Sequence, residues 1–252
     1  MRLDKYLSAR YGSRTKAAEA IASGLVRVNG KIANAAYDYK DGDLIEISKP
    51  EVSFVSNGGY KLDKAIKDFN FDVRGKTVVD VGASNGGFTD CLFQHGVHKV
   101  YCIDVGENQL DSSLHGKNIV IIDNFNARNL TREIFKEKID GAVIDVSFIS
   151  LTYILRQVTE VLDEGAFVIA LIKPQFECES KKVGKNGIVK DASIHKKVIT
   201  KIYDFAQEAG LATENITNAP LRDGKNMEYL ILLKKCSIQK LDKNQIFKYV
   251  KL

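Results

Sequence analysis

Short apolar runs separated by amphipathic stretches dominate the chain from Gly75 onward. The runs are rich in Val and Ile and have the length of buried strands, whereas helix-period patterns, including residues 151–162 and 194–209, lie between them. This βαβ rhythm predicts an α/β domain of the Rossmann-like type, with a mostly parallel sheet covered by helices on both faces. The expected strands are Thr77–Val81, Lys99–Asp104, Asn118–Ile122, Gly141–Asp145, Ala166–Ile172 and a late Tyr229–Leu233.

Residues 1–49 follow a different pattern, which predicts a small α+β domain. A turn at Tyr11-Gly12-Ser13 separates two short helical patterns, and the second helix is expected at Arg14–Ser23. Strands are expected at Leu25–Val28, which runs into an Asn29-Gly30 hairpin turn, and at Asp43–Ile47.

A polar segment around Pro50 separates these two patterns. Its proline and polar residues are typical of a linker, and a short helix is expected after it, from Asp63 to Phe69. Gly58 and Gly59, just before Lys61, suggest a backbone bend that aims the lysine side chain. We therefore predict a first domain at residues 1–49, an interdomain linker at 50–59 and the α/β domain at 60–252.

The formal charge is concentrated at the N-terminal end. Residues 1–31 hold seven Lys/Arg and two Asp/Glu, whereas the remaining residues hold thirty of each sign. Such asymmetry is typical of a module that binds a polyanion, although a solvated basic face is the alternative. Clustered cations of this kind suit contact with a phosphate backbone. The candidate phosphate contacts are Arg10, Arg14, Lys16, Arg27 and Lys31.

Composition argues against several classes of protein. No apolar run is long enough to span a bilayer, and the first residues lack the apolar region of a secretory signal. The four cysteines are scattered without a Cys-x-x-Cys pair. We therefore expect a cytoplasmic protein with reduced thiols, no metal and no membrane segment.

A glycine-bearing loop follows the first strand of the α/β domain and reads Gly-x-Ser-x-Gly-Gly from Gly82. Glycine adopts positive φ at little cost and carries no Cβ, so such a loop suits close approach of a ligand. A serine-hydrolase elbow with Ser84 as nucleophile is one interpretation, but no His follows the late strand. A dinucleotide loop is another, but the glycine spacing is not Gly-x-Gly-x-x-Gly. A cofactor without phosphates fits better, and S-adenosylmethionine is such a cofactor.

Polar residues end neighbouring strands of the predicted sheet and should converge at its C-terminal edge. Asp104, about twenty residues past the loop, is placed to accept a hydrogen bond from a ribose hydroxyl. Asp123 and Asn126 follow the third strand, where contacts to adenine are commonly made; a turn-capping role is the alternative for Asp123. The expected cofactor contacts are Asp80, Gly82, Ala83, Ser84, Gly86, Gly87, Phe88, Asp104, Asp123 and Asn126.

Asp145 and Lys173 end two strands that should be adjacent, and Pro174 directly follows the lysine. A structural salt bridge is one interpretation. The functional one is that Lys173 assists proton loss from a ribose hydroxyl while Asp145 holds its ammonium group.

Several motifs together resemble known families. The N-terminal motifs resemble an S4 RNA-binding domain: Arg2-Leu3-Asp4-Lys5-Tyr6-Leu7, Ser13-Arg14-Thr15-Lys16-Ala17 and Gly24-x-Val26-x-Val28-Asn29-Gly30-Lys31. Further motifs resemble the TlyA family of ribosomal RNA 2′-O-methyltransferases, once described as haemolysins: Gly58-Gly59-Tyr60-Lys61-Leu62, the loop from Asp80 to Asp90, Lys173-Pro174-Gln175-Phe176-Glu177 and Gly187-Ile188-Val189-x-Asp191. One departure is Asn57, where the family often has Arg.

The resemblance implies more than the residues alone do. It implies an FtsJ-like fold with a Lys-Asp-Lys-Glu catalytic tetrad, S-adenosylmethionine as cofactor and cytidine 2′-hydroxyls of ribosomal RNA in assembled subunits as substrate. Carried over by motif, the tetrad is Lys61, Asp145, Lys173 and Glu228. A non-catalytic ribosome-assembly protein and a membrane-active haemolysin are the alternatives from other functional classes.

Overall fold

The structure, a computed structural model, describes residues 1–22, 24–48, 52–184, 186–221, 224–236, 241–248 and 250. The chain divides into two compact units, Met1–Ser53 and Phe54–Leu252, and each is described by itself. Residue 49 of the predicted first domain and residues 50–51 of the predicted linker lie outside the described residues. The domain limits expected at residues 49 and 60 stay predictions.

The first unit packs short helices against a small antiparallel sheet. Ser13 caps α3, because its Oγ accepts a hydrogen bond from the Lys16 amide at 3.1 Å. Leu3, Ile21 and Val26 are among the buried residues of its core. The predicted α+β domain is confirmed. Its elements are α1 (Leu3–Tyr6), α2 (Ser8–Tyr11), α3 (Arg14–Ala22), β1 (Val26–Val28), β2 (Lys31–Ile32) and β3 (Ile45–Ile47), with strand order β2-β1-β3.

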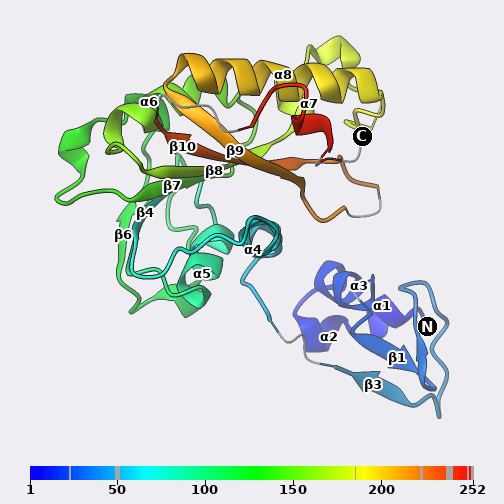
Figure 1. Ribbon diagram of the computed structural model, residues 1–252. Helices are drawn as coiled ribbons and strands as arrows, with labels where there is room; N and C mark the ends of the chain where they lie inside the picture. Colours follow the sequence, from blue (N-terminus) through cyan, green and yellow to red (C-terminus); the bar gives the residue numbers. More distant parts are fainter. Residues whose placement is uncertain are drawn as a thin grey trace. The chain divides into compact units, whose positions relative to one another are not determined.

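The second unit is built on a larger sheet (Figure 1), whose strand order in the described residues is β6-β5-β4-β7-β8-β10-β9. Strands β4 to β8 are parallel, and β10 runs antiparallel between β8 and β9. This arrangement confirms the predicted mostly parallel sheet. The strands are β4 (Thr77–Val81), β5 (Lys99–Ile103), β6 (Ile119–Ile122), β7 (Gly141–Ile144), β8 (Phe167–Ile172), β9 (Leu211–Asn218) and β10 (Tyr229–Lys235).

Strand β9 was not expected from the sequence. It lies at the edge of the sheet and includes polar residues such as Glu214 and Asn215 between its apolar ones. Strands β4, β7 and β8, in contrast, are buried along their whole length, so their sequences are almost continuously apolar. The apolar pattern therefore revealed the central strands and missed the edge strand.

Helices cover both faces of this sheet, with α6 and α8 on one face and α4 and α5 on the other (Figure 1). No helix in the described ranges is long and apolar enough to cross a membrane. The helices of this unit are α4 (Asn57–Phe69), α5 (Gly87–Gln94), α6 (Thr152–Val161), α7 (Pro174–Glu177) and α8 (Ala192–Glu208), with 3₁₀ turns η1 (Ser112–Leu114), η2 (Ala127–Asn129), η3 (Arg132–Ile134), η4 (Ser180–Lys182) and η5 (Ile246–Lys248).

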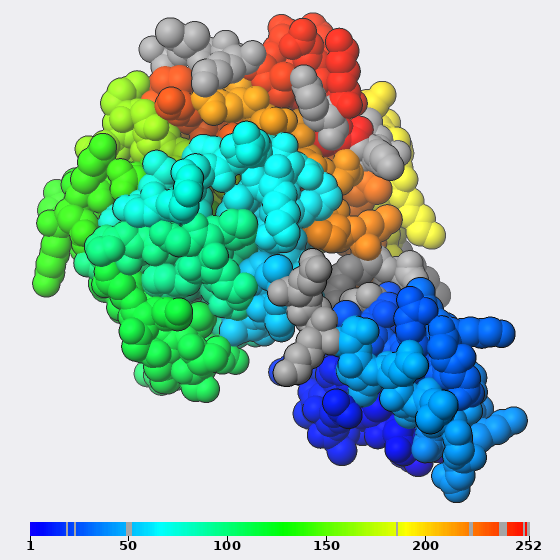
Figure 2. Space-filling model, turned by 60° about the horizontal axis from the view of Figure 1, so that its bottom comes forward, coloured from blue at the N-terminus to red at the C-terminus, as the bar shows by residue number. Residues whose placement is uncertain are grey.

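Helix α4 begins earlier than expected, because the helix predicted to start at Asp63 starts at Asn57. Gly58 and Gly59 suggested a bend, but they serve close packing instead. A Cβ on Gly59 would lie 2.4 Å from the Phe54 side chain, so only glycine fits there. The helix packs along α5 and against β9 and β10, which brings segments far apart in the sequence side by side (Figure 2).

Candidate active site

The C-terminal ends of the parallel strands meet along one edge of the large sheet. The register pairs Val81 of β4 with Ile103 of β5 and with Ile144 of β7, so the residues that follow these strands are neighbours. A hollow of about 180 Å³, called here the loop hollow, lies at this edge. It is lined by Ser56, Gly58, Gly82, Ala83, Ser84, Asn85, Gly87, Phe88, Asp145, Ser147 and Lys173.

The loop after β4 needs its glycines for close approach. Gly82 has φ of 82°, and a Cβ there would lie 2.6 Å from the Asp145 carbonyl oxygen. A Cβ on Gly87 would lie 2.1 Å from Ser56 Oγ. The loop backbone therefore lies directly against the loop after β7 and against the segment before α4, which leaves room for a ligand beside bare backbone.

Asp80 of β4 is fully buried, and its two carboxylate oxygens differ in their hydrogen bonding. Its Oδ2 accepts a hydrogen bond from Thr89 Oγ1 at 2.7 Å, whereas its Oδ1 has no hydrogen-bond partner among the described residues. Burial, reinforced by the negative charges of Asp145 and Asp104 and opposed by the Thr89 hydrogen bond, raises the pKa of Asp80 to about 7. A buried carboxylate in this condition is suited to a cationic ligand group.

Asp104, directly after β5, holds two loops. Its Oδ2 accepts from the Ser84 amide and its Oδ1 from the Gly106 amide, each at 2.8 Å. The first bond fixes Ser84 in a left-handed conformation with φ of 48°. Each carboxylate oxygen has a second lone pair, so Asp104 keeps capacity to accept from a ribose hydroxyl.

Asp123 and Asn126 have local roles in the structure. Asp123 Oδ2 accepts from the Asn108 amide at 2.9 Å, which is the turn-capping alternative considered above. Asn126 Oδ1 accepts from the Arg128 amide at 3.0 Å and caps η2. Neither residue lines the loop hollow, but their loop is hydrogen-bonded to the loop after β5, where the Asn124 amide donates to the Gly106 carbonyl at 3.0 Å.

Lys173 follows β8 and reaches the loop hollow. Its Nζ forms an ion pair with Asp145 Oδ1 at 2.6 Å and donates to Ser147 Oγ at 2.8 Å. The two charged side chains are 10% and 20% exposed. An ammonium group has three protons to donate, so Lys173 is held in place and still has capacity for a ligand oxygen.

Lys61 and Glu228 form a second ion pair at the same edge. Lys61 Nζ, on α4, lies 2.6 Å from Glu228 Oε2, and Gln175 Nε2 donates to the other carboxylate oxygen at 3.1 Å. Tyr229 of β10 pairs with Ile172 of β8, so Glu228 lies next to Lys173 across the two strands. The four tetrad positions thus meet, although Lys61 and Glu228 do not line the loop hollow.

The loop after β7 carries residues that the sequence analysis did not single out. Phe148 is 90% exposed, and its φ of 64° is unusual for a bulky residue. Its ring lies 4.9 Å, centroid to centroid, from that of Phe176. Ser147, next to it, holds Lys173. Ser147 and Phe148 come shortly after Asp145, which ends a predicted strand, and this position is the sequence signal that could have identified them.

Glu177, on α7, holds the loop after β7 in place. Its buried carboxylate accepts from the Leu151 amide and from Ser150 Oγ, both at 2.6 Å, and pairs with Lys201 Nζ at 2.9 Å. These contacts join the loop after β7 to α7 and α8. Glu177 is therefore a positioning residue for the segment that carries Ser147.

A buried histidine ties the 187–189 segment to the start of β10. His195 Nε2 lies 2.9 Å from the Val189 carbonyl, which can only accept, so this nitrogen carries the proton. The Tyr229 hydroxyl then donates to Nδ1 at 2.8 Å. Asn226 adds hydrogen bonds to the Val189 amide and the Gly187 carbonyl. This network explains why the Gly-Ile-Val motif is placed beside the strand that carries Glu228.

One group within the described residues has the chemistry of metal ligands. Side-chain atoms of Asp63, Cys91 and His95 lie within 4.8 Å of one another. Asp63 already contacts His95 at 2.9 Å and Lys67 at 2.7 Å. The expectation of a protein without a metal stays a prediction.

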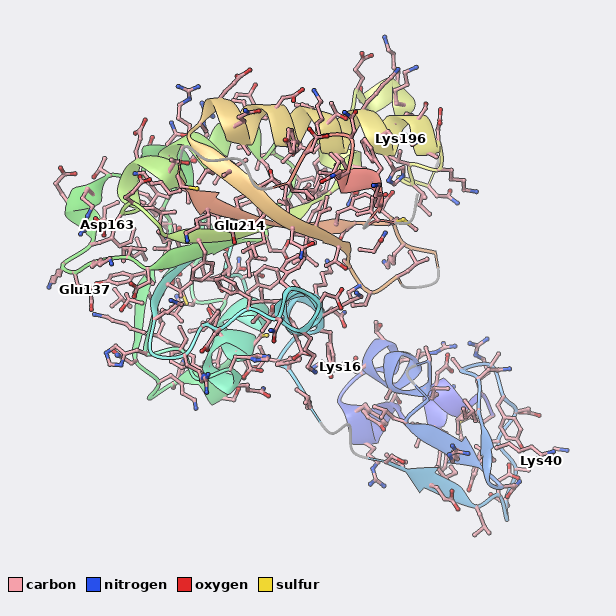
Figure 3. The ribbon with its side chains drawn as sticks, viewed as in Figure 1. Lys16, Lys40, Glu137, Asp163, Lys196 and Glu214 are labelled. Carbon is pink, nitrogen blue, oxygen red and sulfur yellow. The ribbon has the colours of Figure 1, made fainter. Side chains whose placement is uncertain are left out.

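The candidate RNA-contact residues of the first unit are all exposed. Arg14 lies 3.2 Å from Asp4, whose pKa is lowered to about 2, chiefly by the hydrogen bond from Arg2. Lys16 and Lys40 lie at opposite ends of this unit (Figure 3). The exposed candidates are Arg10, Arg14, Lys16, Arg27 and Lys31.

Comparison with known proteins agrees with this geometry. The FtsJ-like methyltransferase family matches residues 54–236, and the S4 domain family matches residues 1–45. Hemolysin A of Brachyspira hyodysenteriae is 41% identical, covering 91% of this chain and 98% of that protein. The 16S/23S rRNA (cytidine-2′-O)-methyltransferase TlyA of Mycobacterium tuberculosis is 36% identical, covering 88% and 84%. A solved structure from Streptococcus thermophilus that carries the name hemolysin is 35% identical, covers 98% of this chain and 93% of its own, and has a TM-score of 0.77. The chain therefore belongs to the FtsJ-like methyltransferases, in the TlyA or hemolysin A family that joins this domain to an S4 domain.

Proposed function

We propose that this protein transfers a methyl group from S-adenosylmethionine to cytidine 2′-hydroxyls of ribosomal RNA. The observation that carries the proposal is the meeting of the glycine loop, the Lys173–Asp145 pair and the Lys61–Glu228 pair at one sheet edge. The named activity of the Mycobacterium tuberculosis relative supplies the substrate class.

The chain's own residues fit this cofactor. S-adenosylmethionine supplies an electrophilic methyl group on a sulfonium. Asp80 has an unpartnered buried oxygen for a cationic amino group, and Asp104 keeps lone pairs for a ribose. The bare backbone at Gly82 permits close approach. We assign cofactor contacts to Asp80, Gly82, Ala83, Ser84, Gly86, Gly87, Phe88 and Asp104, with Asp123 and Asn126 on the adenine side.

Lys173 positions the acceptor oxygen in this mechanism. Asp145 and Ser147 anchor its ammonium, and the remaining donor capacity is directed to the ribose 2′-oxygen. The positive charge stabilises the negative charge that develops on that oxygen as its proton passes to solvent water. The Lys61–Glu228 pair lies beside it and holds the ribose in line for displacement. The exposed ring of Phe148 offers a stacking surface to the target base.

The substrate is proposed to be RNA in an assembled ribosomal subunit, and the activity is proposed to be cytoplasmic. Support comes from the S4 domain, whose exposed cations suit phosphate contacts rather than base readout. Arg10, Arg14, Lys16, Arg27 and Lys31 are the proposed contacts.

Purified ribosomal subunits and tritiated S-adenosylmethionine test the proposal. Wild-type protein should label RNA as 2′-O-methylcytidine, Lys173→Ala should not, and Lys196→Ala, an exposed lysine of α8, should label normally. No label in either subunit or in protein-free RNA would contradict the proposal. Calorimetry with the cofactor then separates the alternatives, because a non-catalytic assembly protein should bind none. Leakage of lipid vesicles by the pure protein would instead support a haemolysin.

A further inference from the structure

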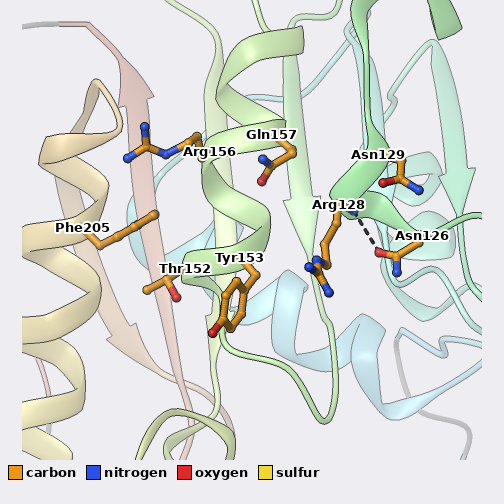
Figure 4. A pocket seen from close by; sticks show the side chains of 8 residues that line it. All are labelled: Asn126, Arg128, Asn129, Thr152, Tyr153, Arg156, Gln157 and Phe205. Carbon is orange, nitrogen blue, oxygen red and sulfur yellow. Dashed lines mark hydrogen bonds between the residues drawn. The ribbon is translucent and has the colours of Figure 1, made fainter.

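A second hollow, with a volume of about 610 Å³, lies beside α6 and is called here the α6 hollow (Figure 4). It is bordered by η2, by the first half of α6 and by α8. Helix α6 begins directly after the loop that carries Ser147 and Phe148, and η2 follows β6. The α6 hollow therefore adjoins the sheet edge that holds the proposed active site. Its lining residues are Asn126, Arg128, Asn129, Thr152, Tyr153, Arg156, Gln157 and Phe205.

The cations of this hollow are placed against aromatic rings. The Arg128 guanidinium lies 5.7 Å from the centre of the Tyr153 ring, and that of Arg156 lies 5.8 Å from the centre of the Phe205 ring. Both arginines are exposed, and neither has an ion pair with a carboxylate in the part of the chain that is described. Their charge is therefore available to an anion from solution.

The other lining groups favour a nucleotide over an acidic peptide. Tyr153 is 59% exposed, so its ring is open to stacking. The amides of Asn129 and Gln157 offer both donors and acceptors, which matches the edge of a base, and none of the described lining residues is acidic. A flat ring, guanidinium groups and amides together are the combination that binds single-stranded nucleic acid.

We propose that the α6 hollow binds a nucleotide of the substrate RNA outside the methylated position. Its phosphates pair with Arg128 and Arg156, and its base stacks on Tyr153. The inference rests on the proposed function for the identity of the RNA. It gives the methyltransferase domain an RNA subsite of its own, which does not depend on the S4 domain.

Steady-state methylation of ribosomal subunits by the full-length protein tests the subsite. Arg128→Gln and Arg156→Gln should each raise KM for subunits about threefold to tenfold, with kcat unchanged. Each should also reduce the slope of log affinity against log salt by about 1. Tyr153→Ala should raise KM, whereas Tyr153→Phe keeps the ring and should not.

Lys117→Gln is the matched control. Lys117 is exposed and lies 5.8 Å from the centre of the Phe93 ring, so it makes the same kind of contact. It precedes β6, at the opposite edge of the parallel sheet from the proposed active site. Equal KM and salt slope for the arginine variants and this control would overturn the subsite. Melting temperatures confirm that each variant is folded.

Binding measurements separate this inference from the proposed function. The affinity of fluorescently labelled subunits can be measured even if the wild type transfers no methyl group, so the subsite is still tested in that case. Protein-free ribosomal RNA provides the second arm. Weaker binding of the variants to that RNA supports the subsite. Weaker binding to subunits alone would assign the hollow to a ribosomal protein and overturn the inference.

Discussion

Charges are used in opposite ways at the sheet edge and on the S4 domain. At the edge they are largely buried and paired: Lys173 is 10% exposed beside Asp145, and the Glu177 side chain is 1% exposed. On the S4 domain, Lys16 and the other candidate contacts are exposed. Removing one partner of a buried pair leaves an uncompensated charge, whereas exposed cations act together and are screened by salt. The effects of single substitutions should therefore be large and specific at the C-terminal edge of the sheet. On the S4 domain they should be small and salt-dependent.

The largest effect is expected for Lys173→Ala. Loss of the ammonium removes the group that orients the ribose oxygen, so kcat should fall by about 10³-fold. Affinity for subunits, measured by filter binding, should change little, because the S4 cations are intact. Lys196→Ala on exposed α8 is the control and should retain activity. If Lys173→Ala had a normal kcat but bound RNA weakly, Lys173 would be an RNA contact like the S4 cations and would not act on the ribose oxygen.

Glu177→Gln should have the next largest effect, through the loop that it holds. Gln cannot accept from Leu151, Ser150 and Lys201 with the charge of a carboxylate, and the site is buried. We expect kcat to fall about tenfold and the melting temperature by about 5 °C. Lys201→Met keeps the contacts to Leu151 and Ser150, so its kcat should fall less. If both variants lowered kcat equally, the effect of Glu177 would come from its ion pair with Lys201 and not from its hydrogen bonds to the loop.

Cofactor affinity should depend on the charge of Asp80. Its pKa is raised to about 7 from the ordinary 3.8, so the carboxyl group is protonated in the folded protein below that pH. An ammonium group binds the ionised form, so affinity should fall about tenfold per pH unit below pH 7. It should fall again above about pH 8, where the α-amino group of the cofactor loses its own proton. Calorimetry across this range, with release of a proton below pH 7, measures the effect.

Asp80→Asn provides the control for this pH dependence. It should weaken binding at pH 8 and flatten the profile. Because the folded pKa is the higher one, ionisation of Asp80 destabilises the wild-type fold progressively as pH rises from about 4 to about 7. The Asn variant should lack this decline in denaturant unfolding. An unchanged profile for cofactor binding would exclude Asp80 as the ammonium partner.

The central strands of the sheet were predictable because fully buried strands have almost continuously apolar sequences. Fully buried β7 and β8 are apolar throughout, and parallel strands bring their ends together, so Asp145 and Lys173 could be paired from the sequence alone. Edge strand β9 includes polar residues and lacks such an apolar run. Lys61 is a lysine on an amphipathic helix, which by itself has no distinguishing pattern, and only the family resemblance indicated it.

Other features depend on contacts that no local pattern encodes. Glu228 reaches Lys61 because β10 inserts antiparallel beside β8. The glycines before Lys61 suggested a bend, whereas the Phe54 side chain requires a residue without a Cβ at Gly59. Phe148 and Glu177 are ordinary residues in the sequence, and their roles follow from an exposed ring and from a buried set of hydrogen bonds.

The smallest effect is expected for Lys16→Gln on the S4 domain. One exposed cation contributes one phosphate contact among several, so affinity for ribosomal RNA should fall about threefold and the salt slope by about 1. Both kcat and the melting temperature should stay unchanged. Arg14→Gln is the informative companion, because Arg14 also pairs with buried Asp4, and its loss should lower the melting temperature as well. If Lys16→Gln instead lowered kcat as strongly as Lys173→Ala, the S4 cations would have to act on the reacting ribose. Burial would then no longer separate the two regions.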